Sequence, residues 1–227
     1  MEKLVYALWG VRDGFVEKRG PELLALDPRG LTINVLEPDV DMSAVVPDRG
    51  GDKVGATVGV WLDSLDDRNP YEAILGTAAE RTAGYLVTES VPLAYQERTW
   101  PDGKRSPGVK QITMFDKRAD IDDTHFFARW HGSHTPLTFE VHPVCLYVRH
   151  AVARAVTEGA PRWRGIVEEG LREVQDLTDP MRYFSAASPE ELERNVKRVM
   201  DDVATFLDLE SVESYPTAEY ILRSLPA

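Results

Sequence analysis

Three of the five histidines in this 227-residue chain, His125, His131 and His134, lie close together in sequence. His131 and His134 are three residues apart and Trp130 lies four residues before His134, so on a helix these side chains project in neighbouring directions. An imidazole beside a large apolar ring suits acid–base chemistry in an apolar pocket, because its charge changes near neutral pH. A half-buried, hydrogen-bonded histidine without a catalytic role is the alternative, and the spacing leaves both open.

Metal chemistry is less favoured at this cluster. His131 and His134 with Asp122 or Asp123 lack the His-Glu-x-x-His spacing of a zinc helix, so we expect no metal. The single cysteine, Cys145, lies in an apolar strand-like run and is expected to be buried and inert.

The charge and hydropathy of the chain narrow the classes of partner that it can bind. With 38 acidic and 26 basic residues, the surface should repel nucleic acid and anionic lipid. The apolar run near the N-terminus is too short for a signal peptide, and no run of about 18 apolar residues follows. We therefore expect a soluble cytoplasmic protein whose partner is a hydrophobic small molecule, and homodimer formation stays open.

An internal repeat organises the chain. Residues 3–8 and 110–115 are both strand-like and are followed by Arg and Asp, while residues 89–95 and 213–218 both read as closing strands. Ser188, followed by proline and by Glu191, forms a capping box that starts a helix, and we place the extra residues of the second half in this longer helix.

The expected order is β-α-β-β-α-β, twice. The elements are a strand at 3–10, a helix at about 17–26, strands at 30–37 and 53–62, a helix at about 68–80, a strand at 82–95, a strand at 109–116, a helix at 122–134, strands at 143–151 and 162–170, a helix at 189–207 and a strand at 212–222. The chain thus divides into residues 1–98, a linker or clasp at 99–108, and residues 109–227. This predicts an α+β fold in which two tandem ferredoxin-like units pair their sheets into a pseudo-dimeric α+β barrel.

The second half resembles the EthD family of the dimeric α+β barrel superfamily. The resemblance covers about 110 residues and rests on these segments in order: Phe115-Asp116-Lys117-Arg118, the helix with Phe126, Trp130 and His134 followed by Thr135-Pro136, Tyr147-Val148-Arg149-His150, Trp163-Arg164-Gly165, and Phe184 before the capped helix. The first half has neither histidine nor tryptophan at 17–26, so we expect one site per chain. The resemblance implies barrels that host cofactor-free oxygenases, dehydratases, cyclases, isomerases or haem enzymes.

We therefore expect a cofactor-independent enzyme acting on an aromatic, polyketide-like or terpenoid-like molecule in an apolar barrel pocket between sheet and helix. His134 is the expected general acid or base, with Tyr147 or His150 as its partner. These two face opposite sides of a strand, and we choose Tyr147 because Arg149 shares its side and could hold an enolate or phenolate.

The remaining predictions concern the residues of the pocket walls, the paired glutamates and the alternative functions. Trp130, Phe127 and His131 are the expected substrate-binding residues beside Arg149. Glu168 and Glu169 are adjacent, so one carboxylate should enter the barrel and could orient a histidine, although a solvated or salt-bridged pair is more frequent. No cofactor is expected; haem is the alternative, and an accessory role beside an oxygenase is a third reading.

Overall fold

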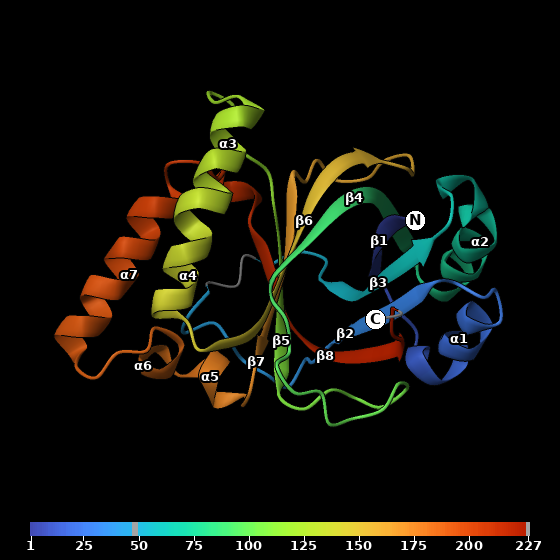
Figure 1. The fold of residues 1–227 in the computed structure, drawn as a ribbon, viewed down its shortest axis with the longest axis horizontal. Coiled ribbons are helices and arrows are strands. Elements are labelled where there is room, and N and C mark those ends of the chain that lie inside the picture. The colour runs from blue at the N-terminus through green and yellow to red at the C-terminus, as the bar shows by residue number, and fades with distance from the viewer. Residues whose placement is uncertain (47–49, 226–227) are drawn as a thin grey trace.

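The computed structural model describes residues 1–46 and 50–225, which form a closed antiparallel barrel of eight strands with helices on two sides (Figure 1). The first half contains β1 (Glu2–Trp9), α1 (Phe15–Leu24), β2 (Gly30–Leu36), β3 (Val54–Leu62), the 3₁₀ turn η1 (Leu65–Arg68), α2 (Asn69–Ala78) and β4 (Arg81–Leu93). The second half contains β5 (Val109–Phe115), α3 (Asp123–Arg129), the π-helical turn η2 (Trp130–His134), α4 (Thr135–Val141), β6 (Val144–Ala155), β7 (Gly165–Leu171), α5 (Gln175–Thr178), α6 (Pro180–Tyr183), α7 (Pro189–Val203), the 3₁₀ turn η3 (Leu209–Ser211) and β8 (Glu213–Arg223). Among the described residues, no helix has both the length and the apolarity that a membrane crossing requires.

The two halves share one sheet. Around the barrel the order is β1-β3-β2-β8-β5-β7-β6-β4, so the strands of each half are neighbours and the halves join where β2 meets β8 and β4 meets β6. The expected β-α-β-β-α-β order of strands and long helices is present in each half. Neither half closes a barrel alone, because each needs the other half at both of its edges.

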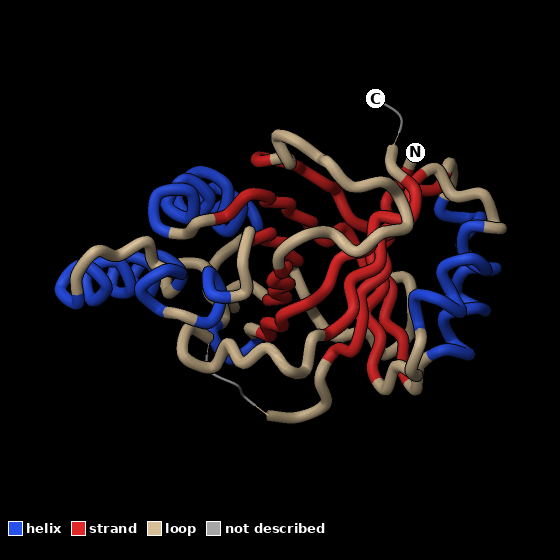
Figure 2. Tube along the Cα trace, turned by 90° about the horizontal axis from the view of Figure 1, so that it is seen from below, coloured by secondary structure: helices blue, strands red, loops and turns tan. Residues whose placement is uncertain are grey.

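Alternation along the strands separates an inner and an outer face. In β1, Leu4, Tyr6 and Leu8 pack in the core that includes residues of α1 and α2, whereas Val5 and Trp9 pack in the core inside the barrel. In the second half the outer face lies under α3, α4 and α7, on the side of the barrel opposite α1 and α2 (Figures 1 and 2). The second half therefore has its own layer between sheet and helices.

The histidine-bearing helix is longer than predicted. It begins after Asp122, whose side chain accepts a hydrogen bond from the backbone N–H of His125, and it continues to Val141 instead of ending at 134. The backbone N–H of Thr135 bonds to Trp130 five residues back, which makes a π-helical turn directly before Pro136. Proline starts the next α-helical segment without losing a bond there, since its missing N–H falls in a first turn.

The insertion in the second half is also placed differently from the prediction. α7 starts at the predicted cap, with the Ser188 side chain accepting from the backbone N–H of Glu191, but it ends at Val203. Two short helices that the sequence did not suggest, α5 and α6, occupy part of the segment between β7 and α7. Each has four residues, too few for a hydrophobic period to be visible in the sequence.

The segment between the halves is hydrogen-bonded to β8. The backbone N–H groups of Gly103 and Ser106 donate to Ile221 and Glu219 of β8, both at 2.8 Å. The side chain of Ser106 also donates to the Glu219 carboxylate at 2.7 Å. The connection is thereby held against the outermost strand of the second half.

Candidate active site

A cavity of about 260 Å3 lies between the outer face of the second half's sheet and the helices that cover it. β5, β6, β7 and β8 form its floor, while the π-helical turn and α7 form its roof. Val45 and Val46 of the first half line it as well. Most lining side chains are apolar, and the polar ones are Gln111, Thr113, His134, His142, Tyr147, Glu169, Tyr183 and Ser214. The cavity suits a flat, mainly apolar molecule that meets a few polar groups.

His134 lies in the cavity roof and is held by α7. Its Nδ1 is 3.0 Å from one oxygen of Asp202, and the other oxygen accepts from Ser133 at 2.5 Å and Arg129 at 3.2 Å. Burial opposes the charge of Asp202, but the hydrogen bonds from His134 and Ser133 outweigh it and lower the pKa of this carboxyl. The ring also packs on Phe206, with centroids 5.4 Å apart. The imidazole is thus oriented through Nδ1, which leaves Nε2 for a ligand.

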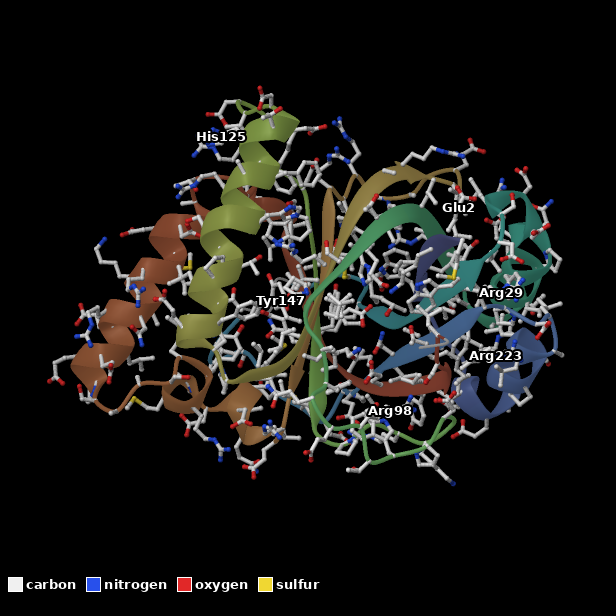
Figure 3. All side chains as sticks on the ribbon, in the orientation of Figure 1. Glu2, Arg29, Arg98, His125, Tyr147 and Arg223 are labelled. Atoms are coloured by element: carbon white, nitrogen blue, oxygen red, sulfur yellow. The ribbon has the colours of Figure 1, made fainter. Side chains whose placement is uncertain are left out.

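Tyr147 lies fully buried in the floor, between the strands and the α3–α4 helix (Figure 3). Burial raises the pKa of Tyr147 above its usual value, so the phenol stays protonated. Arg149, on the same face of β6 as predicted, donates to Thr135 Oγ1 at 3.0 Å. Trp130 Nε1, His131 Nε2 and Arg149 Nε are buried without hydrogen-bond partners in the described structure. Of these three residues, Trp130 lines the cavity, whereas His131 and Arg149 do not.

Three of the predicted substrate-binding residues, Phe127, His131 and Arg149, do not line the cavity. The Phe127 ring stacks on Trp130 with centroids 6.2 Å apart, and the Arg164 guanidinium lies 4.9 Å from the Phe127 ring centroid. The His131 ring packs on Trp130 with centroids 4.9 Å apart. The prediction assumed a regular helix through His134, and the π-helical turn from Trp130 to His134 changes the angular offset between His131 and His134. His125 lies at the far end of α3, away from Tyr147 (Figure 3).

Glu169 is the functional candidate that the sequence did not single out. It lies in the middle of the floor on β7, directly opposite Gln111 on β5 and Tyr147 on β6. Its side chain is buried, and within the described residues no hydrogen bond or ion pair reaches its carboxyl. Burial raises the pKa of Glu169 to about 7. The adjacency of Glu168 and Glu169 was the available signal, but which face would lie in a cavity depended on the helices above.

His142 and Tyr183 close one side of the cavity in an uncharged state. His142 Nδ1 is 2.8 Å from the Tyr183 carbonyl oxygen, and burial lowers the pKa of His142 to about 4. The Tyr183 hydroxyl donates to Gln111 at 3.0 Å, and burial raises its pKa. Both side chains are therefore neutral near pH 7 and keep this wall of low polarity.

The inside of the barrel is occupied by a chain of buried charges. Six strands contribute to it: Lys3, Glu89, His150, Glu168, Lys110 and Glu219. Glu168 is 2.7 Å from Lys110 and 2.8 Å from His150 Nε2, which confirms that one of the paired glutamates enters the barrel and meets a histidine. Burial opposes its charge, yet Lys110 and His150 lower the pKa of Glu168 well below the usual range. The cavity described above therefore lies outside the barrel wall, while ion pairs fill this part of the interior.

Among the described residues, no three or more His, Cys, Asp or Glu side chains form a group that could hold a metal ion. Cys145 is half-buried, and burial raises the pKa of its thiol, which disfavours the thiolate.

Comparison with known proteins identifies the fold. No family model matches the chain, and no curated protein matches it in sequence. An anthrone oxidase-like protein superposes with a TM-score of 0.57 at 12% identity, over 97% of this chain and 91% of that one. A chlorite dismutase of Candidatus Nitrospira defluvii gives 0.51 at 11% identity, over 97% and 92%, and a candidate monooxygenase of Fusobacterium nucleatum subsp. nucleatum gives 0.50 at 10%, over 98% and 93%. These are dimeric α+β barrel proteins, so the chain has that fold.

Proposed function

We propose that this protein is a cofactor-independent enzyme that moves protons on a flat aromatic or polyketide-like molecule bound between sheet and helices. The observation that carries the proposal is the apolar cavity in which His134, held by Asp202, faces a floor with the buried Tyr147. His134 acts as general acid or base, and the Tyr147 hydroxyl binds the oxygen on which negative charge develops. Elimination, cyclisation, isomerisation and oxygenation of such a molecule all begin with this proton transfer.

The proposal also covers the relationship between the two halves and the family type of the second half. We infer that the two halves are tandem ferredoxin-like units, because each has the same element order and strand order, and that the second half is of the EthD type. The cavity is lined mainly by residues of the second half, which agrees with an EthD-type second half that carries the site. An enzyme explains a locked histidine in an apolar cavity better than an accessory protein does.

The test compares His134→Gln with His125→Gln. The fold likeness to an anthrone oxidase-like protein suggests three-ring ketones and phenols as test compounds, supplied without metal or cofactor. His134→Gln should lower turnover about 100-fold or more with an unchanged circular dichroism spectrum. His125→Gln, at the far end of α3, should leave turnover unchanged. Equal turnover of the folded His134→Gln protein and the wild type would remove His134 from the mechanism.

Haem is the second candidate, and the residues present do not fit it. The cavity of about 260 Å3 is small for a porphyrin, since ligand pockets usually measure roughly 300–1,000 Å3. Haem also carries two carboxylates, and the described lining residues include neither arginine nor lysine, while Glu169 adds a carboxyl group. Haemin titration should therefore give no stoichiometric Soret band, and a saturable band lost in His134→Gln would reverse this assignment.

A further inference from the structure

We infer that Glu169 is the base that removes a carbon-bound proton from the molecule in this cavity, and that the molecule is a neutral, planar carbon acid. This inference rests on the proposed function and assigns a catalytic residue that the sequence did not suggest. Glu169 lies on the floor and His134 in the roof, so a flat ring between them meets one proton-handling group on each side.

Two polar side chains close to Glu169 donate their hydrogen bonds to other acceptors. Tyr183 gives its hydroxyl proton to Gln111 Oε1 at 3.0 Å. The Gln111 amide N–H donates to Ser214 at 2.8 Å, so it is turned away from the carboxyl directly opposite it on β7. A buried carboxyl is normally hydrogen-bonded, because an unpaired one is costly. Here Tyr183 and Gln111 donate to other acceptors, and the carboxyl of Glu169 faces the cavity.

This arrangement is that of a reactive group rather than a structural one. The adjacent Glu168 is a buried carboxylate with a structural role: on the opposite face of β7 it lies 2.7 Å from Lys110 and 2.8 Å from His150. Glu169 has no such partner among the residues that the structure describes, and a carboxylate stripped of solvent and donors is a stronger base than one in water. The neutral His142 and Tyr183 keep its surroundings of low polarity.

The lining also restricts the ligand. Among the described lining residues there is no lysine or arginine to balance a carboxylate or phosphate, and Glu169 would repel one. The aromatic side chains Phe115, Trp130 and Phe206 favour a planar apolar ring. A neutral aromatic ketone with an acidic C–H group conjugated to the carbonyl satisfies both conditions.

The step balances without a further reactant. The carboxylate oxygen of Glu169 takes the proton, the electron pair of the C–H bond moves into the new C=C bond, and the carbonyl becomes an enolate oxygen. The hydroxyl of Tyr147 donates a hydrogen bond to that oxygen. The protonated Glu169 exchanges its proton with solvent, and in D2O it returns a deuteron to the same carbon, which regenerates the ketone with deuterium in place of hydrogen.

This exchange is the experiment, with 9-anthrone as the probe under anaerobic conditions. Proton NMR in D2O follows loss of its methylene signal with wild type, Glu169→Gln, Glu169→Asp and the exposed-loop control Glu158→Gln. Binding is followed separately by quenching of tryptophan fluorescence. We expect Glu169→Gln to bind the probe but to exchange at least about 100-fold more slowly, Glu169→Asp to retain part of the rate, and Glu158→Gln to match the wild type.

The outcomes separate the two proposals. If the wild type does not bind the probe, the ligand class in the proposed function is wrong and this inference falls with it. If the probe binds and exchanges equally in wild type and Glu169→Gln, the cavity function stands and Glu169 is not the base. If Glu169→Gln instead loses binding of the neutral probe while folded, the carboxyl has a binding role and the assignment as base is overturned.

Discussion

Replacing Glu169 by glutamine should change how stability depends on pH, independently of any ligand. The carboxyl has a pKa of about 7 in the folded protein and about 4.5 when unfolded, so the folded state holds this proton more tightly. Stability is therefore present at low pH and is lost as pH rises from 4.5 to 7. The loss over the whole titration is about 3 kcal/mol, and about 2–3 kcal/mol falls between pH 5 and pH 8.

Urea unfolding followed by tryptophan fluorescence at several pH values measures this effect. The glutamine side chain has its own burial cost, but that cost does not titrate and only shifts the curve. Relative to wild type, Glu169→Gln should gain about 2–3 kcal/mol on going from pH 5 to pH 8, because the other titrating groups are common to both proteins. The exposed Glu158→Gln should run parallel to the wild type. Parallel curves for Glu169→Gln would show that its carboxyl is solvated or paired, which refutes the reasoning.

Three further changes test the scaffold that holds the site. Lys110→Met leaves the buried Glu168 without its partner at 2.7 Å and should lower the free energy of unfolding by about 3–5 kcal/mol in urea titration. Gly165→Ala places a methyl group 2.4 Å from a ring carbon of Phe115, so we expect a loss of about 1–3 kcal/mol and altered near-ultraviolet circular dichroism. Ser188→Ala removes the α7 cap and should lower thermal stability by about 1 kcal/mol while leaving ligand binding unchanged.

Each of these has a contradicting result. If Lys110→Met leaves the free energy of unfolding unchanged, water or rearranged side chains compensate the charge of the carboxylates inside the barrel. If Gly165→Ala keeps the stability and the near-ultraviolet circular dichroism of the wild type, β7 moves away from the Phe115 ring without a loss of stability. A Ser188→Ala variant that loses binding would show that the start of α7 influences the cavity.

The sequence predicted some of the residues that line the cavity, and local rules account for them. Trp130, His134 and Tyr147 line the cavity, because helical spacing and strand alternation act over a few residues. Phe127, His131 and Arg149, predicted as substrate-binding residues, do not line it, and the π-helical turn from Trp130 to His134 breaks the regular period that related His131 to His134. Asp202, which orients His134, is 68 residues away in sequence, so no local pattern links the two.

The sequence by itself determined the order of the elements, the duplication of that order and the confinement of the histidine–tryptophan cluster to the second half. Those features follow from hydrophobic periods, capping residues and composition, which act over a few residues. The tertiary structure alone decided that Glu168 enters the barrel among ion pairs, while its neighbour Glu169 faces an apolar cavity with no hydrogen-bond or ion-pair partner in the described part of the chain. Adjacent residues on a strand must part in this way, but what each one meets depends on side chains from distant strands and helices, and their burial and charge set its chemistry.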